Sequence, residues 1–182
     1  MSLPIDEDIL IQQLRDTKTR SNTFSALVKA YSEPLYWHIR RMVLSHDDTN
    51  DLMQNTFIKA WTSIDSFRGD SQLSTWLYRI AINETLTFLS KRTQSIPIDS
   101  PEASVVEQLE SDTYFNGDKA EAIFQEALQK LPPKQRMVFN MKYYEEMKYE
   151  EISEILGTSV GALKASYHIA VKKIEEFLKE RN

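Results

Sequence analysis

The segment Tyr149-Glu-Glu-Ile-Ser-Glu-Ile-Leu-Gly157-Thr-Ser-Val-Gly-Ala-Leu-Lys164 decides the fold of the C-terminal part of the chain. Apolar residues in its first half recur at helical spacing and supply one buried side: Ile152, Ile155 and Leu156. Gly157 can take the left-handed backbone conformation that ends a helix. Thr158 or Ser159 can then cap a second helix by accepting a backbone N–H. Two helices joined by a short glycine-containing turn predict a helix-turn-helix.

The second helix of this motif has two chemically different sides. The apolar side, which we expect to be buried, consists of Leu163, Tyr167, Ala170 and Ile174. A recognition helix enters the major groove of DNA by its N-terminal part, so the other side is the candidate DNA surface. With the cap residue, it comprises Ser159, Gly161, Lys164, Ala165, His168 and Lys172. Lysine suits phosphates and can donate to guanine, but no Arg, Asn or Gln offers bidentate base reading, so we expect modest sequence discrimination.

Upstream of the motif, a helical period runs from about Ala120 to Leu131. Pro132-Pro133 ends this helix and starts the next one. Residues 97–117 contain prolines, serines and acidic residues with poor periodicity, which indicates a flexible linker. Residues 97–120 hold six of the acidic side chains against one lysine, so this acidic connector alone accounts for the formal net charge of −5. The rest of the chain is neutral, and any DNA contact therefore needs help from a partner.

The N-terminal part predicts further helices. Short amphipathic helices are expected over 5–16 and 23–31, and Pro34 is placed in the first turn of a new helix. The next helix, opened by Asp47 and Asp48, carries a core stripe: Met53, Phe57, Ala60, Trp61 and Ile64. Residues 67–71 break the pattern as a loop, and a long helix follows over about 74–91.

Composition excludes several classes of protein. Only four glycines argue against a many-turned β protein, and the absence of cysteine excludes disulfides and thiol chemistry. The three histidines have no metal-ligand spacing, and we expect no cofactor. No apolar run approaches membrane-spanning length, and the acidic start lacks the basic residues of a signal peptide. We therefore expect a cytoplasmic protein with no membrane insertion.

Two blocks of sequence resemble one known family. The run from Asp51 to Asn83 (Asp51-Leu-Met-Gln-Asn-Thr-Phe-Ile-Lys-Ala-Trp61, Ser66-Phe-Arg-Gly69, Ser74-Thr-Trp-Leu-Tyr-Arg-Ile-Ala-Ile-Asn83) resembles the second conserved domain of bacterial sigma factors. Leu131-Pro-Pro-Lys-Gln-Arg-Met-Val-Phe139 and the helix-turn-helix resemble the fourth domain. Two such domains joined by a short linker are similar to the extracytoplasmic-function (ECF) group of the sigma-70 family. The resemblance implies an all-α fold of two small helical domains, 1–95 and 118–182, joined by a flexible acidic linker over 96–117.

The resemblance also implies the partners and the site residues. Core RNA polymerase, promoter DNA and an anti-sigma factor are the partners that it implies. Three residues match the face that grips the polymerase: Asp51, Gln54 and Asn55. The loop from Phe67 to Gln72 matches the segment that captures a flipped base of the upstream promoter element. Together with that loop, the matching DNA-contacting residues of the N-terminal domain are Phe67, Arg68, Gln72, Asn83, Glu84, Thr87 and Lys91.

Two other functions are open to the same sequence. A stand-alone helix-turn-helix regulator would need a ligand pocket or a phosphoacceptor aspartate at a strand end, and the sequence predicts no strands. A hydrolase is suggested by paired acids such as Glu145/Glu146 and Glu150/Glu151. Adjacent acids on a helix surface or turn do not converge on one site, so we expect a binding protein and no enzyme. Stoichiometric binding to core RNA polymerase separates the sigma factor from both alternatives.

Overall fold

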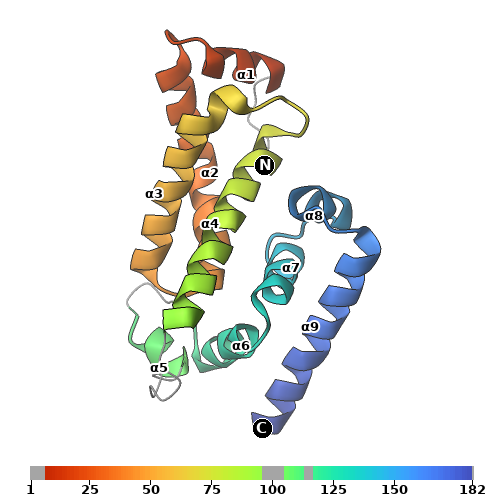
Figure 1. Ribbon diagram of the computed structural model, residues 1–182. Helices are drawn as coiled ribbons and strands as arrows, with labels where there is room; N and C mark the ends of the chain where they lie inside the picture. Colours follow the sequence, from red (N-terminus) through yellow and green to blue (C-terminus); the bar gives the residue numbers. More distant parts are fainter. Residues whose placement is uncertain (1–6, 96–104, 113–116, 182) are drawn as a thin grey trace.

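The structure, a computed structural model, describes residues 7–95, 105–112 and 117–181. All regular elements of these residues are helical (Figure 1). Their bounds are α1 Glu7–Arg15, α2 Arg20–Val43, α3 His46–Ser63, the 3-10 turn η1 Ile64–Ser66, α4 Leu73–Ser95, α5 Val105–Glu110, α6 Lys119–Gln129, α7 Pro133–Tyr143, α8 Tyr149–Leu156 and α9 Val160–Arg181. The predicted all-α class and helix-turn-helix are confirmed.

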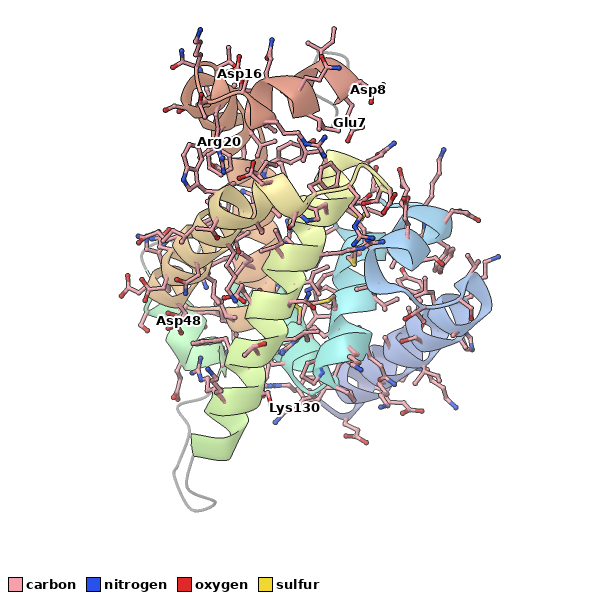
Figure 2. The ribbon with its side chains drawn as sticks, turned by 45° about the horizontal axis from the view of Figure 1, so that its top comes forward. Glu7, Asp8, Asp16, Arg20, Asp48 and Lys130 are labelled. Atoms are coloured by element: carbon pink, nitrogen blue, oxygen red, sulfur yellow. The ribbon has the colours of Figure 1, made fainter. Side chains whose placement is uncertain are left out.

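The N-terminal half is a bundle of α2, α3 and α4, with α1 lying across one end (Figure 1). Ser45 caps α3 by accepting the Asp48 N–H, and the acids of the first turn oppose the positive end of the helix dipole. Glu7 of α1 accepts the N–H of Leu73 at the start of α4 (Figure 2 shows Glu7 on α1). These contacts fix where each helix begins.

The N-terminal half differs from the sequence expectation at Pro34. Pro34 lies inside the single 24-residue helix α2, where we had predicted the start of a separate helix. Proline removes one backbone hydrogen bond from a helix interior. Leu27 and Tyr31 before Pro34 and Leu35 after it are all buried. Their packing in the core keeps the helix continuous through the proline.

The expected linker also contains structure. Helix α5 lies within it, and Val106 and Leu109 pack with Leu44 and Ala122 in a small apolar cluster. Arg40 of α2 pairs with Asp112 just after this helix. Our prediction of a wholly flexible linker missed the helix because its apolar residues span less than two turns. The remainder of the linker, residues 96–104 and 113–116, lies outside the described residues.

The C-terminal half follows the predicted helices closely. Asp118 caps α6 by accepting the Glu121 N–H, and Pro133 occupies the first turn of α7. Gly157 ends α8 with a φ of 64°, in the left-handed region. Ser159 then accepts the Ala162 N–H at the start of α9. The turn chemistry read from the sequence therefore operates as expected.

The two halves pack against each other along a seam in which α2 contacts α7 and α4 contacts α8. Side chains fill the space between these helices (Figure 2). The largest apolar cluster spans the seam: it joins Leu35, Met42 and Leu77 to Met137 and Ile152. The sequence alone did not predict that the two halves pack together. The helical spacing of apolar residues shows which face of a helix is buried, but it does not show which other helix covers that face.

Candidate functional site

The outer face of α3 presents the residues expected to grip a partner. Asp51, Gln54 and Asn55 are exposed, while Leu52 and Met53 between them are buried. One turn further along, Ile58 is 60% exposed. A single exposed apolar side chain is ordinary on a protein surface, so the exposed polar residues carry the expectation of a partner here. The α3 outer face can therefore bind another protein without disturbing the core.

The loop after α3 divides its predicted residues into two groups. Arg68 and Gln72 are exposed, and Gly69 turns the chain at a φ of 80°. Phe67 is only 4% exposed, because its ring packs against Trp76 at 5.1 Å between centroids. In this conformation the Phe67 ring packs inside the loop, and it has to leave Trp76 before it can stack on a base.

The predicted strip on α4 faces solvent beside α3. Asn83, Thr87 and Lys91 are exposed, and Glu84 is half-buried in an ion pair with Lys59 of α3. A shallow hollow of about 270 Å³ opens between the two helices. Its lining consists of Lys59, Thr62, Ser63, Ile80, Asn83 and Glu84. The hydroxyl, amide and charged groups of this lining can hydrogen-bond to the edges of an unpaired base, and Ile80 adds an apolar contact.

The groove-facing side of α9 is open along its length. All six predicted residues, Ser159, Gly161, Lys164, Ala165, His168 and Lys172, are exposed. Lys164 lies with Nζ 5.7 Å from the centre of the Tyr149 ring, and Lys172 makes an exposed ion pair of 3.9 Å with Glu176. Exposed pairs of this kind are weak, so both ammonium groups can exchange these contacts for phosphates.

Three groups were missed or misplaced by the sequence reading. Lys59 shows no role in the sequence, yet it pairs with Glu84 at the hollow. Trp61 is predicted to be in the core and is 38% exposed, with Arg20 over its ring at 4.7 Å. His38 has no partner at a local spacing in the sequence, yet it contacts Glu145 across the seam. A single sequence carries no signal for such long-range pairs.

Burial dominates the ionisation shifts in the structure. It raises the pKa of Tyr78 and Tyr144, both at the seam, far above the usual value, so these phenols stay neutral. Burial also lowers the pKa of Arg136 to about 10, which leaves that guanidinium charged at neutral pH. None of these shifts places a titrating acid or base at the hollow or on the α9 face.

The described residues contain no group of three or more His, Asp or Glu side chains arranged to hold a metal ion. No helix in the described part of the chain is long and apolar enough to cross a membrane.

Comparisons with known proteins match both halves of the chain. Residues 27–95 match the family model "Sigma-70 region 2", and residues 121–174 match "Sigma-70, region 4". The ECF RNA polymerase sigma factor SigW of Bacillus subtilis is 30% identical over 90% of this chain and 92% of its own. The ECF RNA polymerase sigma-E factor of Escherichia coli K12 is 29% identical over 96% of this chain and 95% of its own.

Two solved structures share the fold over most of their length. The sigma factor RpoE, in complex with the anti-sigma factor NepR from Bartonella quintana, is 27% identical with a TM-score of 0.65. It covers 86% of this chain and 96% of its own. CnrH, in complex with the cytosolic domain of CnrY, has a TM-score of 0.71 at 23% identity, over 97% of this chain and 99% of its own. Because the relatives match both halves in one order over nearly the whole chain, this protein belongs to the ECF group of RNA polymerase sigma factors.

Proposed function

We propose that this sigma factor divides its work among three separate surfaces of the described chain. As a member of its family it binds core RNA polymerase and directs promoter recognition, DNA melting and transcription initiation. The α3 outer face (Asp51, Gln54 and Asn55) would bind the polymerase. The hollow and α4 would contact the upstream promoter element, and α9 would read the distal element. The observation that carries this division is that every predicted contact except Phe67 already faces solvent or lines the hollow.

The chemistry of the two DNA surfaces supports different tasks. Around the hollow, Asn83 and Glu84 offer hydrogen-bonding groups suited to base edges, and Arg68 and Lys91 add positive charge. On α9, Lys164 and Lys172 suit phosphates of duplex DNA. Phe67 joins the upstream surface if its ring is displaced from Trp76 when DNA binds.

The remaining roles follow from the family. We propose a cytoplasmic binding protein that requires no cofactor and catalyses no reaction. The structural relative RpoE is bound by the anti-sigma factor NepR. We accordingly propose that an anti-sigma factor regulates this chain too.

The direct test is capture of core RNA polymerase by the full chain, followed by run-off transcription from genomic DNA. The wild-type chain should bind stoichiometrically and start transcripts at discrete sites. The Asp51→Ala/Gln54→Ala variant should lose binding, whereas Glu33→Ala, an exposed acid on α2, should retain it. A chain that binds promoters without polymerase, and shows no affinity for the core enzyme, would favour the stand-alone regulator instead.

A further inference from the structure

Basic side chains of the N-terminal half make polar contacts across the seam. In the described part of the chain these are His38, Arg41 and Arg79. Their partners on the C-terminal half are the Glu145 carboxylate, the Tyr144 ring and the carbonyl groups of Glu154 and Ile155. Complementary polar groups fix the register of two surfaces more than they add to affinity. The closed arrangement is therefore specified by polar contacts, in addition to the apolar cluster.

The centre of this set is the pair formed by His38 and Glu145. The His38 side chain is fully buried, and its Nδ1 lies 2.7 Å from Oε1 of Glu145, whose side chain is 11% exposed. Among the described residues, Nε2 of His38 and Oε2 of Glu145 have no hydrogen-bond partner. Buried polar atoms without partners weaken a packed state, because opening returns them to water. The pair thus sets how the two halves align in the seam, and its unpaired atoms lower the free energy needed to separate them.

The groups that face this pair come from two helices, α2 and α4, and from the turn after α7. His38 lies on α2, and the Tyr78 ring of α4 packs on the His38 ring at 5.5 Å between centroids. Arg41, one turn along α2, lies 4.3 Å from the centre of the Tyr144 ring. Glu145 itself sits in the turn between α7 and α8, where Glu146 has a φ of 53°. A non-glycine residue in the left-handed region stores strain, and here the strained turn delivers the Glu145 carboxylate into the seam.

The second feature of the seam is Arg79. Its Nε donates to the Ile155 carbonyl at 3.3 Å, and its Nη2 donates to the Glu154 carbonyl, so it caps the C-terminal end of α8. Asn83, a proposed promoter contact, lies four residues further along α4 and hence one turn away on the same face of the helix. Arg79 is therefore a cation near the proposed promoter surface, and two of its nitrogen atoms, Nε and Nη2, donate to α8.

We propose that the seam is an autoinhibitory clasp in which α8 sequesters Arg79 and the His38–Glu145 pair sets the strength of closure. In the open form, Arg79 is released to contact a DNA phosphate beside Asn83, and the two halves are free to reach two promoter elements. In the closed form the spacing of the halves is fixed by the seam, and Arg79 is withheld. This inference rests on the proposed polymerase and promoter binding.

The clasp is tested first without polymerase. The chain has no cysteine, so Ala26→Cys on α2 and Glu180→Cys on α9, both at exposed positions, place one donor and one acceptor dye on different halves. Energy transfer should fall when Glu145→Gln removes the charge while keeping the shape of the side chain. Glu146→Gln, the exposed neighbour in the same turn, is the matched control and should behave as wild type. Equal transfer in the two variants overturns the clasp.

A double-substitution cycle separates the pair from general loosening of the fold. His38→Gln and Glu145→Gln should each lower energy transfer, and the double variant should lower it no further than either alone. Additive effects mean that the two side chains act independently and contradict the proposal. Circular dichroism of each variant confirms that the helices are retained, so loss of transfer reports separation of the halves.

The second arm uses unlabelled full-length chain with core polymerase and promoter DNA. Because the closed form fixes the spacing of the halves, we expect only the open form to place both halves on the polymerase. Glu145→Gln should therefore raise the apparent core affinity by about three- to tenfold as the competent fraction rises. Arg79→Ala should also open the clasp, yet it should weaken promoter binding by the holoenzyme and lower its salt slope by about one. Undiminished promoter binding by Arg79→Ala would leave it a structural residue and overturn its assigned role. Failure of the wild-type chain to bind core polymerase would count against the proposed function, while energy transfer still reports on the clasp.

Discussion

Helices α4 and α9 have nearly the same length, 23 and 22 residues, and both carry a proposed DNA surface, but they are built differently. Helix α4 is packed by α2, α3 and α8, whereas α9 lies on α6, α7 and α8 along one side only (Figure 1). The buried residues of α9 are Leu163, Ala170 and Ile174. Seven described residues of α4 are buried and leave a polar strip beside the hollow; the buried residues are Leu73, Thr75, Leu77, Tyr78, Ala81, Ile82 and Thr85.

This difference separates two ways of reading DNA. A helix packed by three others cannot enter a groove, so we propose that α4 offers its strip and the hollow to bases that have left the duplex. A helix exposed along its length can enter the major groove, which suits α9. Substitutions on α4 should therefore risk the fold, while substitutions on the exposed side of α9 should affect the proposed DNA contact with little effect on stability.

The largest contrast should be in stability. Leu77 of α4 is fully buried, so Leu77→Ala should lower the free energy of unfolding by about 2–5 kcal/mol through lost burial and the cavity left behind. Lys164→Ala on the exposed side of α9 should change it by no more than about 0.5 kcal/mol. Denaturant unfolding followed by circular dichroism measures both. Similar losses in the two variants would remove the distinction between an enclosed and an exposed helix.

The next largest effect should be on polymerase affinity, through the α3 outer face. Alanine at Asp51 or Gln54 should weaken core binding by about 1–3 kcal/mol for each anchor. Melting should be almost unchanged because both side chains are exposed on α3. Titration of fluorescent sigma factor with core enzyme gives the affinity. A double variant that binds as tightly as wild type would mean that the polymerase grips another surface.

Removal of Lys164, the first basic residue on the exposed side of α9, should weaken promoter binding by a similar or smaller amount. Lys164→Ala should lower the salt slope of promoter binding by about one if the ammonium contacts a phosphate. If it donates to a guanine, the loss should depend on the distal element and amount to about 1–3 kcal/mol. Lys173→Ala is the control, because Lys173 points off the DNA face and donates to Gln135. Equal effects of the two substitutions would argue against this orientation of α9.

The smallest expected effects come from two glycines of the helix-turn-helix. Gly157→Ala should destabilise the protein by about 1–2 kcal/mol, because φ is 64° there although space around the residue is open. Gly161→Ala lies within α9, also in open space, and should stabilise it by about 1 kcal/mol through helix propensity. Thermal melting of both variants tests the pair. A stabilising Gly157→Ala would show that the turn relaxes out of the left-handed region.

The sequence predicted those features that depend on local chemistry. Helix α8 and its turn came out at the expected residues, because Gly157 and the caps are local signals. Pro34 was placed wrongly, since packing on both sides overrides a lost backbone hydrogen bond. Phe67 was expected to meet DNA and lies on Trp76, because a single aromatic residue in a loop carries no period that would show its burial.

What the sequence could not predict is long-range. The Lys59–Glu84 pair joins positions 25 residues apart, and the His38–Glu145 pair joins positions 107 apart. Neither spacing leaves a pattern in one sequence. The same holds for the docking of α5. Its short apolar run is too brief to predict a buried helix, and it is buried only because it packs against Leu44.

The central claim is that two modest DNA surfaces act as one only when polymerase holds them in place. The formal charge of −5 and the few cations on α9 should leave the isolated chain with weak affinity for duplex promoter DNA. The decisive measurement compares promoter affinity of the isolated chain and of the holoenzyme across a salt series, with matched and distal-mutated promoters. We predict sequence-specific binding by the holoenzyme alone, since linked contacts add avidity. Tight, sequence-specific binding by the isolated chain at physiological salt would contradict this account.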